Sequence, residues 1–449
     1  MPKAKLRMFT SGLCPTLTKP ASLATTRALL THHNVLLASR LPSRASCAST
    51  AFRDKDASAS SDKSSNLPLS GLLVVSLEQA IAGPFCTRQL ADLGARVIKI
   101  ERPGTGDFNR HHDTRVNGLC SHFVWTNRSK ESLTLDLKSP SDLSFLKTKL
   151  LPKADIFLQN LAPGATQRMG LDYASLSPKH PSLIVCDISG YGSTGPYKHK
   201  KAYDLLIQAE SGFLSITGTP DGQPAKSGIS IADIAAGVTA SQSILAAILA
   251  RSRNGGKGCR LDISMLESLA EWMSFPLYYA YEGQSAPKMA GAEHASIYPY
   301  GPFKTGGDGG TVMLGMQNER EWERFCREVL GKEELLGDKR FESTALRSEN
   351  RVALKGIIED VFSGLTSGEV LERLERAGVA NAKVRDMEGL RGHDQLAARG
   401  KWTEVETEVG RVKALKPAGM ADGVEGRMEK IPKIGEHSER IFREFGGER

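Results

Sequence analysis

One acidic residue, Asp233, stands by itself in a long uncharged segment. No other charged side chain lies between Lys226 and Arg251. An ionised carboxylate among apolar side chains is unfavourable unless something compensates it. One interpretation is a helix N-cap, since Asp is a preferred cap and residues 234–250 have a helical pattern. The other is a carboxylate held at a helix start, where exposed N–H groups favour its ionised form and where it can attack an activated acyl group.

Further candidates for chemistry flank this acid. Small residues around it, such as Ala236 and Gly237, either leave space for a substrate or allow tight helix packing. Asp204 is a second acid, but its polar surroundings favour a simple cap. His294 is a candidate base or hydrogen-bond donor. A single histidine is also common as a structural residue, so both interpretations stay open.

A glycine-rich segment, Gly190–Gly195, matches the G-x-G-x-x-G pattern and follows a predicted strand. A dinucleotide site is therefore an alternative. The context argues against it, because Pro196 and the basic run Lys198–Lys201 replace the apolar helix start that such sites need. The glycines fit better in a loop whose backbone approaches a ligand. The basic run either attracts an anionic substrate or is a solvated loop.

No metal site is expected. None of the seven cysteines forms a C-x-x-C pair, and their spacing fits neither a zinc site nor a disulfide framework. Asp233 has no His, Cys or second acid within eight residues along the chain. A metal cluster built on that acid is therefore not expected.

The net charge of +8 is concentrated at the N-terminus. Residues 1–53 hold eight Lys or Arg and no acid, and the remaining chain has equal numbers of both signs. A basic stripe for nucleic acid is therefore not supported. A basic, Ser-rich, acid-free start is typical of a transit peptide, so we expect residues 1–65 to be a presequence plus linker and the protein to reach the mitochondrial matrix. The uncharged run around Asp233 contains polar residues and an acid, so no membrane span is expected.

Strand-like and helix-like segments alternate through the first part of the chain. This alternation predicts β–α–β units and a parallel, Rossmann-like sheet. The predicted strands are residues 71–77, 95–101, 132–137, 154–159, 183–189 and 260–264, with helices at 85–93, 204–211 and from 234 to about 253. The fold class is therefore α/β.

Past residue 265 the pattern changes to aromatic clusters, proline-containing loops and charged amphipathic helices. A strand-like pattern returns at residues 402–420. We predict a large domain formed by residues 66–264 and 391–449, its sheet built from both ends of the chain. A smaller α+β domain, residues 265–390, lies between these parts.

Several strings taken together resemble the family III CoA-transferases over residues 68–445. These are Ala82-Gly83-Pro84, Leu93 to Gly104, Leu135-Asp136-Leu137-Lys138, Asn160 to Gly164, Arg168-Met169-Gly170, Gly190-Tyr191-Gly192, Lys201-Ala202-Tyr203 and Ser227 to Asp233. The resemblance implies an interlocked homodimer that uses acyl-CoA and a dicarboxylate as substrates and has no permanently bound cofactor. It also implies that Asp233 forms an aspartyl-CoA thioester.

By motif position, the resemblance assigns further residues to substrates. The CoA contacts would be Ala82, Arg102, Leu135, Lys138, Asn160, Leu161, Arg168 and Lys201. The basic members of this set suit the phosphates of CoA. We also place Tyr203, His294 and Arg110 near the substrate, with Arg110 a candidate for binding a distal carboxylate.

The resemblance favours transfer of CoA from succinyl-CoA to a small dicarboxylate such as itaconate or mesaconate. Oxalate is less favoured, because the glycine run of oxalate-handling members is absent near His294. A 2-methylacyl-CoA racemase of the same superfamily is the alternative, although Tyr203 stands where racemases have an acid–base histidine. A non-enzymatic CoA-binding scaffold is a third possibility.

Overall fold

The computed structural model describes residues 66–446. The predicted transit peptide and linker, residues 1–65, lie outside the described residues.

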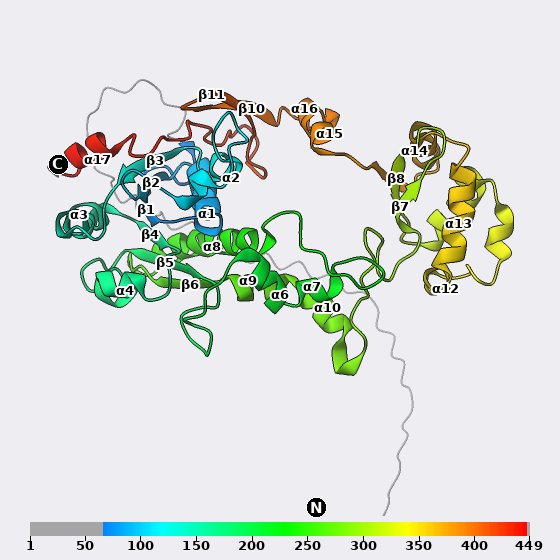
Figure 1. The fold of residues 1–449 in the computed structure, drawn as a ribbon, viewed down its shortest axis with the longest axis horizontal. Coiled ribbons are helices and arrows are strands. Elements are labelled where there is room, and N and C mark those ends of the chain that lie inside the picture. Colours follow the sequence, from blue (N-terminus) through cyan, green and yellow to red (C-terminus); the bar gives the residue numbers. More distant parts are fainter. Residues whose placement is uncertain (1–65, 447–449) are drawn as a thin grey trace, which may run out of the picture. The chain divides into compact units, whose positions relative to one another are not determined.

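A six-stranded parallel sheet forms the centre of the larger region (Figure 1). Its strand order is β3-β2-β1-β4-β5-β6. The order reverses between β1 and β4, and ligands of such sheets bind at this switch point, outside the carboxyl ends of the strands. The strands are β1 (Leu73–Leu77), β2 (Arg96–Glu101), β3 (Lys130–Thr134), β4 (Ile156–Gln159), β5 (Ile184–Ser189) and β6 (Arg260–Ser264).

Both faces of the sheet are covered by helices, as the strand pattern requires. Neighbouring residues of a strand point to opposite faces, so Val74 joins one hydrophobic core and Val75 the other. The first core includes α1 (Ala82–Asp92), α8 (Ile231–Arg251) and α9 (Met265–Trp272). The second includes α3 (Pro140–Phe145) and α17 (Ser438–Glu444). Shorter helices complete this region: α2 (Ser121–Thr126), α4 (Ala165–Met169), α5 (Tyr173–Leu176), α6 (Asp204–Glu210), α7 (Phe213–Ile216) and α10 (Ser274–Tyr279).

Helix α8 is long and apolar enough to cross a membrane by length and composition. Its small residues are nevertheless packed inside the protein: Ala232, Ala236 and Ala240 are fully buried in the first core. This packing explains the uncharged sequence as that of a core helix.

A smaller α+β region has its own core. Its antiparallel sheet has the order β7-β8-β9, formed by β7 (Tyr300–Lys304), β8 (Thr311–Gly315) and β9 (Ala380–Lys383). Helices α11 (Glu319–Arg324), α12 (Thr344–Glu349), α13 (Arg351–Phe362) and α14 (Ser367–Arg376) accompany it. The sequence-based division begins this region at residue 265, but Met265 and Leu269 of α9 pack in the core of the large sheet.

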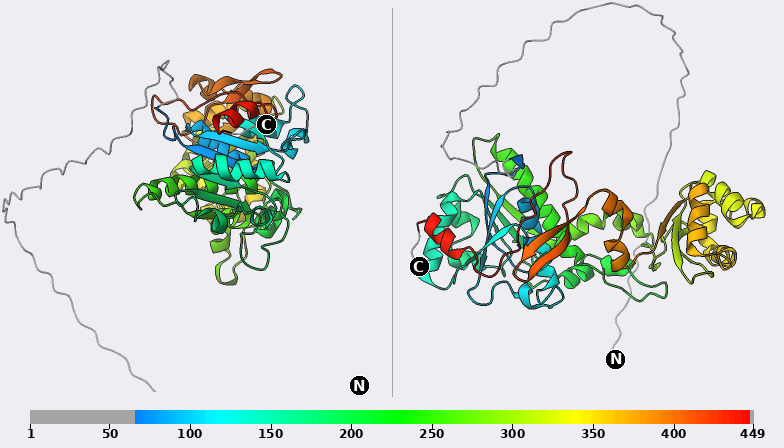
Figure 2. Two further views of the ribbon diagram at one scale, coloured as in Figure 1. Left: turned by 90° about the vertical axis from the view of Figure 1, so that its left-hand side faces the viewer. Right: turned by 90° about the horizontal axis from the view of Figure 1, so that it is seen from above.

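The C-terminal segment returns to the large sheet without adding a strand to it. After α15 (Met387–Arg391) and α16 (Asp394–Ala398), β10 (Trp402–Thr407) and β11 (Gly410–Leu415) form a separate two-stranded sheet. The prediction of one sheet built from both ends of the chain is therefore wrong. The return is made instead by α17, drawn in red beside α3 in Figures 1 and 2, where the rings of Phe442 and Phe145 lie 4.4 Å apart.

Candidate active site

Asp233 is the third residue of helix α8, not its cap. The N-cap position is Ser230, whose side chain makes no capping hydrogen bond. The interpretation of Asp233 as an N-cap is therefore wrong. Asp233 lies in the first turn of α8, its carboxylate does not cap the helix, and the residue lines a cavity.

Asp204 caps α8 from another helix. One of its carboxylate oxygens accepts hydrogen bonds from the backbone N–H groups of Ala232, at 2.8 Å, and Asp233, at 3.4 Å. Its other oxygen accepts from the Gln208 side chain at 2.6 Å. Asp204 itself is the first residue of α6, whose N-cap is Tyr203. It was expected to be a simple cap, and its capping partner proves to be the helix that carries Asp233.

The electrostatics of Asp233 differ from the sequence-based expectation. We expected helix N–H groups to keep this carboxylate ionised, but Asp204 accepts from those nearest to it. Burial, followed by repulsion from the Asp204 carboxylate, raises the pKa of Asp233 to about 7. A hydrogen bond from the Ala82 backbone N–H acts in the opposite direction. Asp233 therefore titrates near neutral pH, where a small change in pH changes the fraction of Asp233 that is ionised.

Gly237 brings helix α1 close to this acid. It lies one turn after Asp233, on the same side of α8. A Cβ atom added at Gly237 would lie 2.9 Å from the carbonyl oxygen of Ala82, the first residue of α1. The small residues around Asp233 thus serve close packing, and that packing sets the α1 N-terminus against the carboxyl group.

A cavity of about 980 Å³ lies at the carboxyl ends of the strands, at the switch point of the sheet. Segments that follow β1, β2, β3, β4 and β5 line it. The lining includes Asp233, Tyr203 and the complete set of expected CoA contacts: Ala82, Arg102, Leu135, Lys138, Asn160, Leu161, Arg168 and Lys201. The fold thus brings together residues spread over 150 positions of the sequence.

Comparison with known proteins identifies the family to which this chain belongs. Residues 69–438 match the family described as CoA-transferase family III. The chain belongs to this family. It is therefore a CoA-transferase.

Relatives and solved structures agree with this assignment. The mouse succinyl-CoA:glutarate CoA-transferase is 33% identical over 387 residues, covering 86% of this chain and 88% of the mouse protein. The acetyl-CoA:oxalate CoA-transferase of Acetobacter aceti is 34% identical over 379 residues, covering 84% of this chain and 96% of that protein. A CaiB/BaiF family protein from Brucella suis has a TM-score of 0.76 and 30% identity, covering 85% of this chain and all of that structure.

Basic side chains surround the cavity of this CoA-transferase. Arg102, Lys138, Arg168 and Lys201 are all exposed at its edge. Exposed basic side chains attract the phosphates of a ligand such as CoA. The acid sits inside and the cations outside, an arrangement that suits an anionic ligand with its reactive end inward.

Arg110 is not available for a substrate carboxylate. Its guanidinium donates to both carboxylate oxygens of Glu101, at 2.8 and 2.7 Å, and to the Pro432 carbonyl oxygen at 3.1 Å. The same group lies 3.7 Å from the centre of the Phe123 ring. Although burial opposes it, the hydrogen bonds from Arg110 lower the pKa of Glu101 to about 2. The structure places Arg110 in a structural ion pair, not at the cavity wall.

His294 is also absent from the residues that line the described cavity. It lies before β7, where its Nδ1 accepts hydrogen bonds from the backbone N–H groups of Ser296 and Ile297. Its ring stacks on Tyr300 at a centroid distance of 5.2 Å. These contacts favour the structural interpretation of this histidine.

Sequence reasoning missed a buried charge network beside the cavity. Lys99, Glu78, Asp107 and Lys130 are joined by ion pairs of 2.7–3.5 Å, and their side chains in these pairs are fully buried. A signal was present, because Lys99 stands between Ile98 and Ile100 in the middle of a buried strand. A charge at such a position is expected to have a buried partner.

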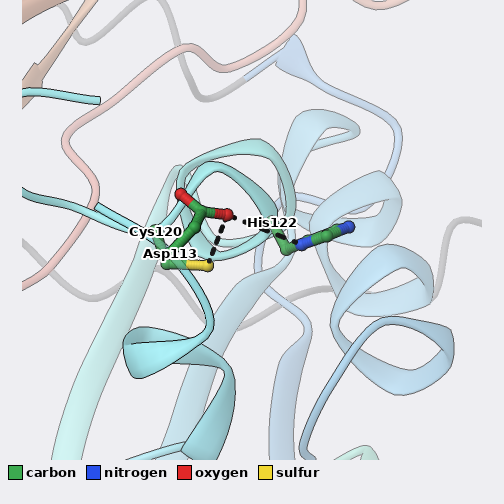
Figure 3. A group of neighbouring side chains, drawn as sticks. All are labelled: Asp113, Cys120 and His122. Atoms are coloured by element: carbon green, nitrogen blue, oxygen red, sulfur yellow. Dashed lines mark hydrogen bonds and ion pairs between the residues drawn. The ribbon is translucent and has the colours of Figure 1, made fainter. Parts of the chain in front are cut away.

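Asp113, Cys120 and His122 form a group with metal-binding side chains (Figure 3). Asp113 accepts from the Cys120 thiol at 3.5 Å and lies 4.0 Å from His122 Nδ1. Its oxygens also accept the backbone N–H and the hydroxyl of Ser121, the first residue of α2. These hydrogen bonds show that Asp113 caps the N-terminus of α2, which accounts for its position without a metal ion.

Proposed function

We propose that the protein moves CoA from succinyl-CoA to a small dicarboxylate, with Asp233 as the nucleophile. The observation that carries the proposal is the position of Asp233. It lies at the inner wall of a cavity whose lining includes all eight residues expected to contact CoA. Relatives named for glutarate, citramalate and mesaconate, each at least 30% identical, support a dicarboxylate acceptor.

The proposed reaction is a double exchange at Asp233. The carboxylate attacks the thioester carbonyl, which gives a mixed anhydride and releases the CoA thiolate. The thiolate attacks the Asp233 acyl carbon, forming an aspartyl-CoA thioester and releasing succinate. The acceptor carboxylate then attacks this thioester, and the thiolate returns to the new acyl group. Asp233 is regenerated, and the energy of the thioester is conserved.

The N-terminus of α1 supports the charged intermediates in this scheme. Ala82 is the first residue of α1, so its N–H has no partner within the helix, and this N–H lowers the pKa of the nearby Asp233 carboxyl group. A backbone N–H group near the Asp233 carboxyl group can stabilise the oxyanion that forms when the thiolate attacks its acyl carbon. The donor is fixed by the packing of α1 on α8 and need not move during the reaction.

The test is incubation with succinyl-CoA and a panel of acids that includes glutarate, itaconate, mesaconate, citramalate and oxalate. We expect a new CoA ester by mass spectrometry with at least one dicarboxylate. Asp233→Ala should abolish it. Hydroxylamine should modify Asp233 only when acyl-CoA is present. Labelling of Asp204 instead would show that the nucleophile is misassigned, and no exchange with any acid would reject CoA transfer.

The racemase alternative needs a second acid–base group opposite Asp233. The side chain at the corresponding position is Tyr203, which is 69% exposed, and the carboxylate beside it, Asp204, is engaged in capping α8. Incubation of a single-enantiomer 2-methylacyl-CoA separates the two activities. Epimerisation without CoA exchange would favour the racemase.

We also propose that the protein is a homodimer. Large apolar side chains are exposed on consecutive helices: Leu245 and Leu249 of α8, Trp272 of α9, and Phe275, Leu277 and Tyr278 of α10. Several large exposed apolar side chains on consecutive helices are typical of an interface. The family resemblance identifies a second copy of the chain as the partner.

The mitochondrial matrix remains our proposed location. It rests on the basic, acid-free composition of residues 1–53. Fusion of residues 1–65 to a fluorescent protein tests it. Import and cleavage would support the proposal, and a diffuse cytosolic signal would contradict it.

A further inference from the structure

The loop between β1 and α1 has an unusual backbone. It runs from Glu78 to Ile81 and leads directly into Ala82. Ala80 has a φ of +61°, a left-handed conformation that costs a non-glycine residue about 1 kcal/mol or more. Such a conformation persists only when the surroundings hold it in place.

Side chains from two other segments, one after β4 and one after β2, hold this loop at successive backbone groups. Asn160, after β4, binds both polar groups of Gln79: its Oδ1 accepts the N–H and its Nδ2 donates to the carbonyl, each at 2.8 Å. Asp107 accepts the Ala80 N–H at 3.2 Å, and Asn109 donates to the Ala80 carbonyl at 3.0 Å. The backbone groups of the two residues at the centre of the loop are thus all bonded to side chains.

The buried charge network fixes the two ends of the loop. Lys99 Nζ donates to the Glu78 carbonyl at 3.2 Å and to Asp107 at 2.9 Å. Lys130 Nζ donates to the Glu78 carboxylate at 2.7 Å and to the Pro84 carbonyl, inside α1, at 2.9 Å. Although burial alone would raise it, the two ammonium groups lower the pKa of Glu78, so this carboxylate stays charged. Burial lowers the pKa of Lys130 to about 8, although Glu78 opposes this shift. A buried pair of this kind is costly to break from one side.

These contacts converge on the start of α1, which packs closely on the helix that carries Asp233. We propose that Asn160, Asp107 and Lys130 are positioning residues that clamp the β1–α1 loop and so hold the Ala82 N–H against Asp233. This inference rests on the proposed function for its catalytic consequence, but not for the clamp itself. Asn160 was expected to contact CoA. Its side chain is instead hydrogen bonded to both backbone groups of Gln79, so we assign it a role in holding the loop.

The test uses Asn160→Ala, which removes a neutral side chain and leaves the buried charges paired. Asn160→Asp is the conservative variant, because it keeps the acceptor for the Gln79 N–H. Asn350→Ala is the matched control. The Asn350 side chain also makes two hydrogen bonds to backbone groups, here the carbonyls of Arg340 and Leu346, and it does not line the cavity. Circular dichroism and melting temperature confirm that each variant folds.

Amide hydrogen exchange measures the clamp without any assumption about activity. In Asn160→Ala we expect the amides of residues 79–82 to exchange about five- to tenfold faster, with a smaller change in Asn160→Asp and none in Asn350→Ala. Unchanged exchange in Asn160→Ala would reject the clamp. If these amides exchange faster in Asn160→Ala but the wild type shows no CoA transfer, the clamp is supported and the proposed function is rejected.

Kinetics then separate positioning from CoA binding. Misplacement of a catalytic donor should lower kcat of Asn160→Ala by about 10- to 100-fold, while the Kd for free CoA, measured by calorimetry, changes less than about twofold. Asn160→Asp should recover part of kcat. A weaker Kd with unchanged kcat would instead show that the Asn160 side chain is a CoA ligand, and would overturn the proposed role.

Discussion

At the scale of the residue, the pair Asp204 and Asp233 explains how one acid is set apart for chemistry. Both stand near helix starts, and from sequence each is a plausible cap. In the structure Asp204 takes the capping hydrogen bonds. Asp233 is left with burial, a neighbouring negative charge and a pKa of about 7. A carboxylate that is costly to ionise is also more reactive as a nucleophile once ionised.

The pH dependence of activity follows from this pair. The ionised form of Asp233 is the nucleophile, so kcat/KM should rise with pH through about 7 and be roughly tenfold below its plateau at pH 6. Asp204→Asn removes the repelling charge and lowers the pKa of Asp233. The acidic limb of the profile should therefore move to lower pH. A limb that stays in place, or moves to higher pH, would contradict the assigned coupling.

Stability should depend on Asp233 in the opposite sense to activity. Its pKa is raised in the folded state, so its contribution to stability is present at low pH and is lost as pH rises through about 7. Asp233→Asn removes a group that must ionise at a buried site. The variant should melt a few degrees above the wild type at pH 8, with a smaller difference at pH 5. A lower melting temperature at pH 8 would show that a favourable contact outweighs the cost of ionising the carboxylate at this site.

At the scale of the element, the site depends on how closely α1 and α8 approach. Gly237→Ala would put a Cβ atom 2.9 Å from the Ala82 carbonyl oxygen and 3.0 Å from the Phe85 ring. We expect a loss of stability of about 1–3 kcal/mol and a lower kcat, because the Ala82 N–H moves away from Asp233. Urea denaturation and steady-state kinetics measure the two effects.

Gly356 provides the matched control for this prediction. It is also a helical glycine, in α13, but a Cβ there meets nothing within 4 Å. Gly356→Ala should leave kcat unchanged and stabilise the protein by up to about 1 kcal/mol, through helix propensity. Equal effects of the two substitutions would mean that the α1–α8 contact has no special role.

The sequence predicts the elements better than their contacts. All six parallel strands were expected, because apolar runs between helix-like segments give a local pattern. The start of β3 was missed, since Lys130 is charged and its buried partner, Glu78, lies 52 residues away. The capping of α8 by Asp204 could not be predicted for the same reason. Local pattern indicates that a group needs a partner, but only the fold identifies that partner.

At the scale of the whole molecule, the apolar surface on α8, α9 and α10 is the feature that a single chain leaves unexplained. Leu277 is 70% exposed and Tyr278 72% exposed, on the helix that directly follows α9. Exposure of several such side chains together opposes solubility, so we expect a second copy to cover them. Light scattering should give twice the 48.6 kDa mass of one chain.

Leu277→Glu tests this assignment, because it places a charge where the proposed interface would bury it. We expect dissociation to monomers, with circular dichroism unchanged. Val352→Glu is the control: Val352 is 84% exposed on α13, outside these three helices, and its substitution should leave the mass doubled. A wild-type mass of one chain would reject the dimer. A Leu277→Glu protein that remains dimeric would place the interface on another surface and leave the α10 side chains to be explained by a different partner.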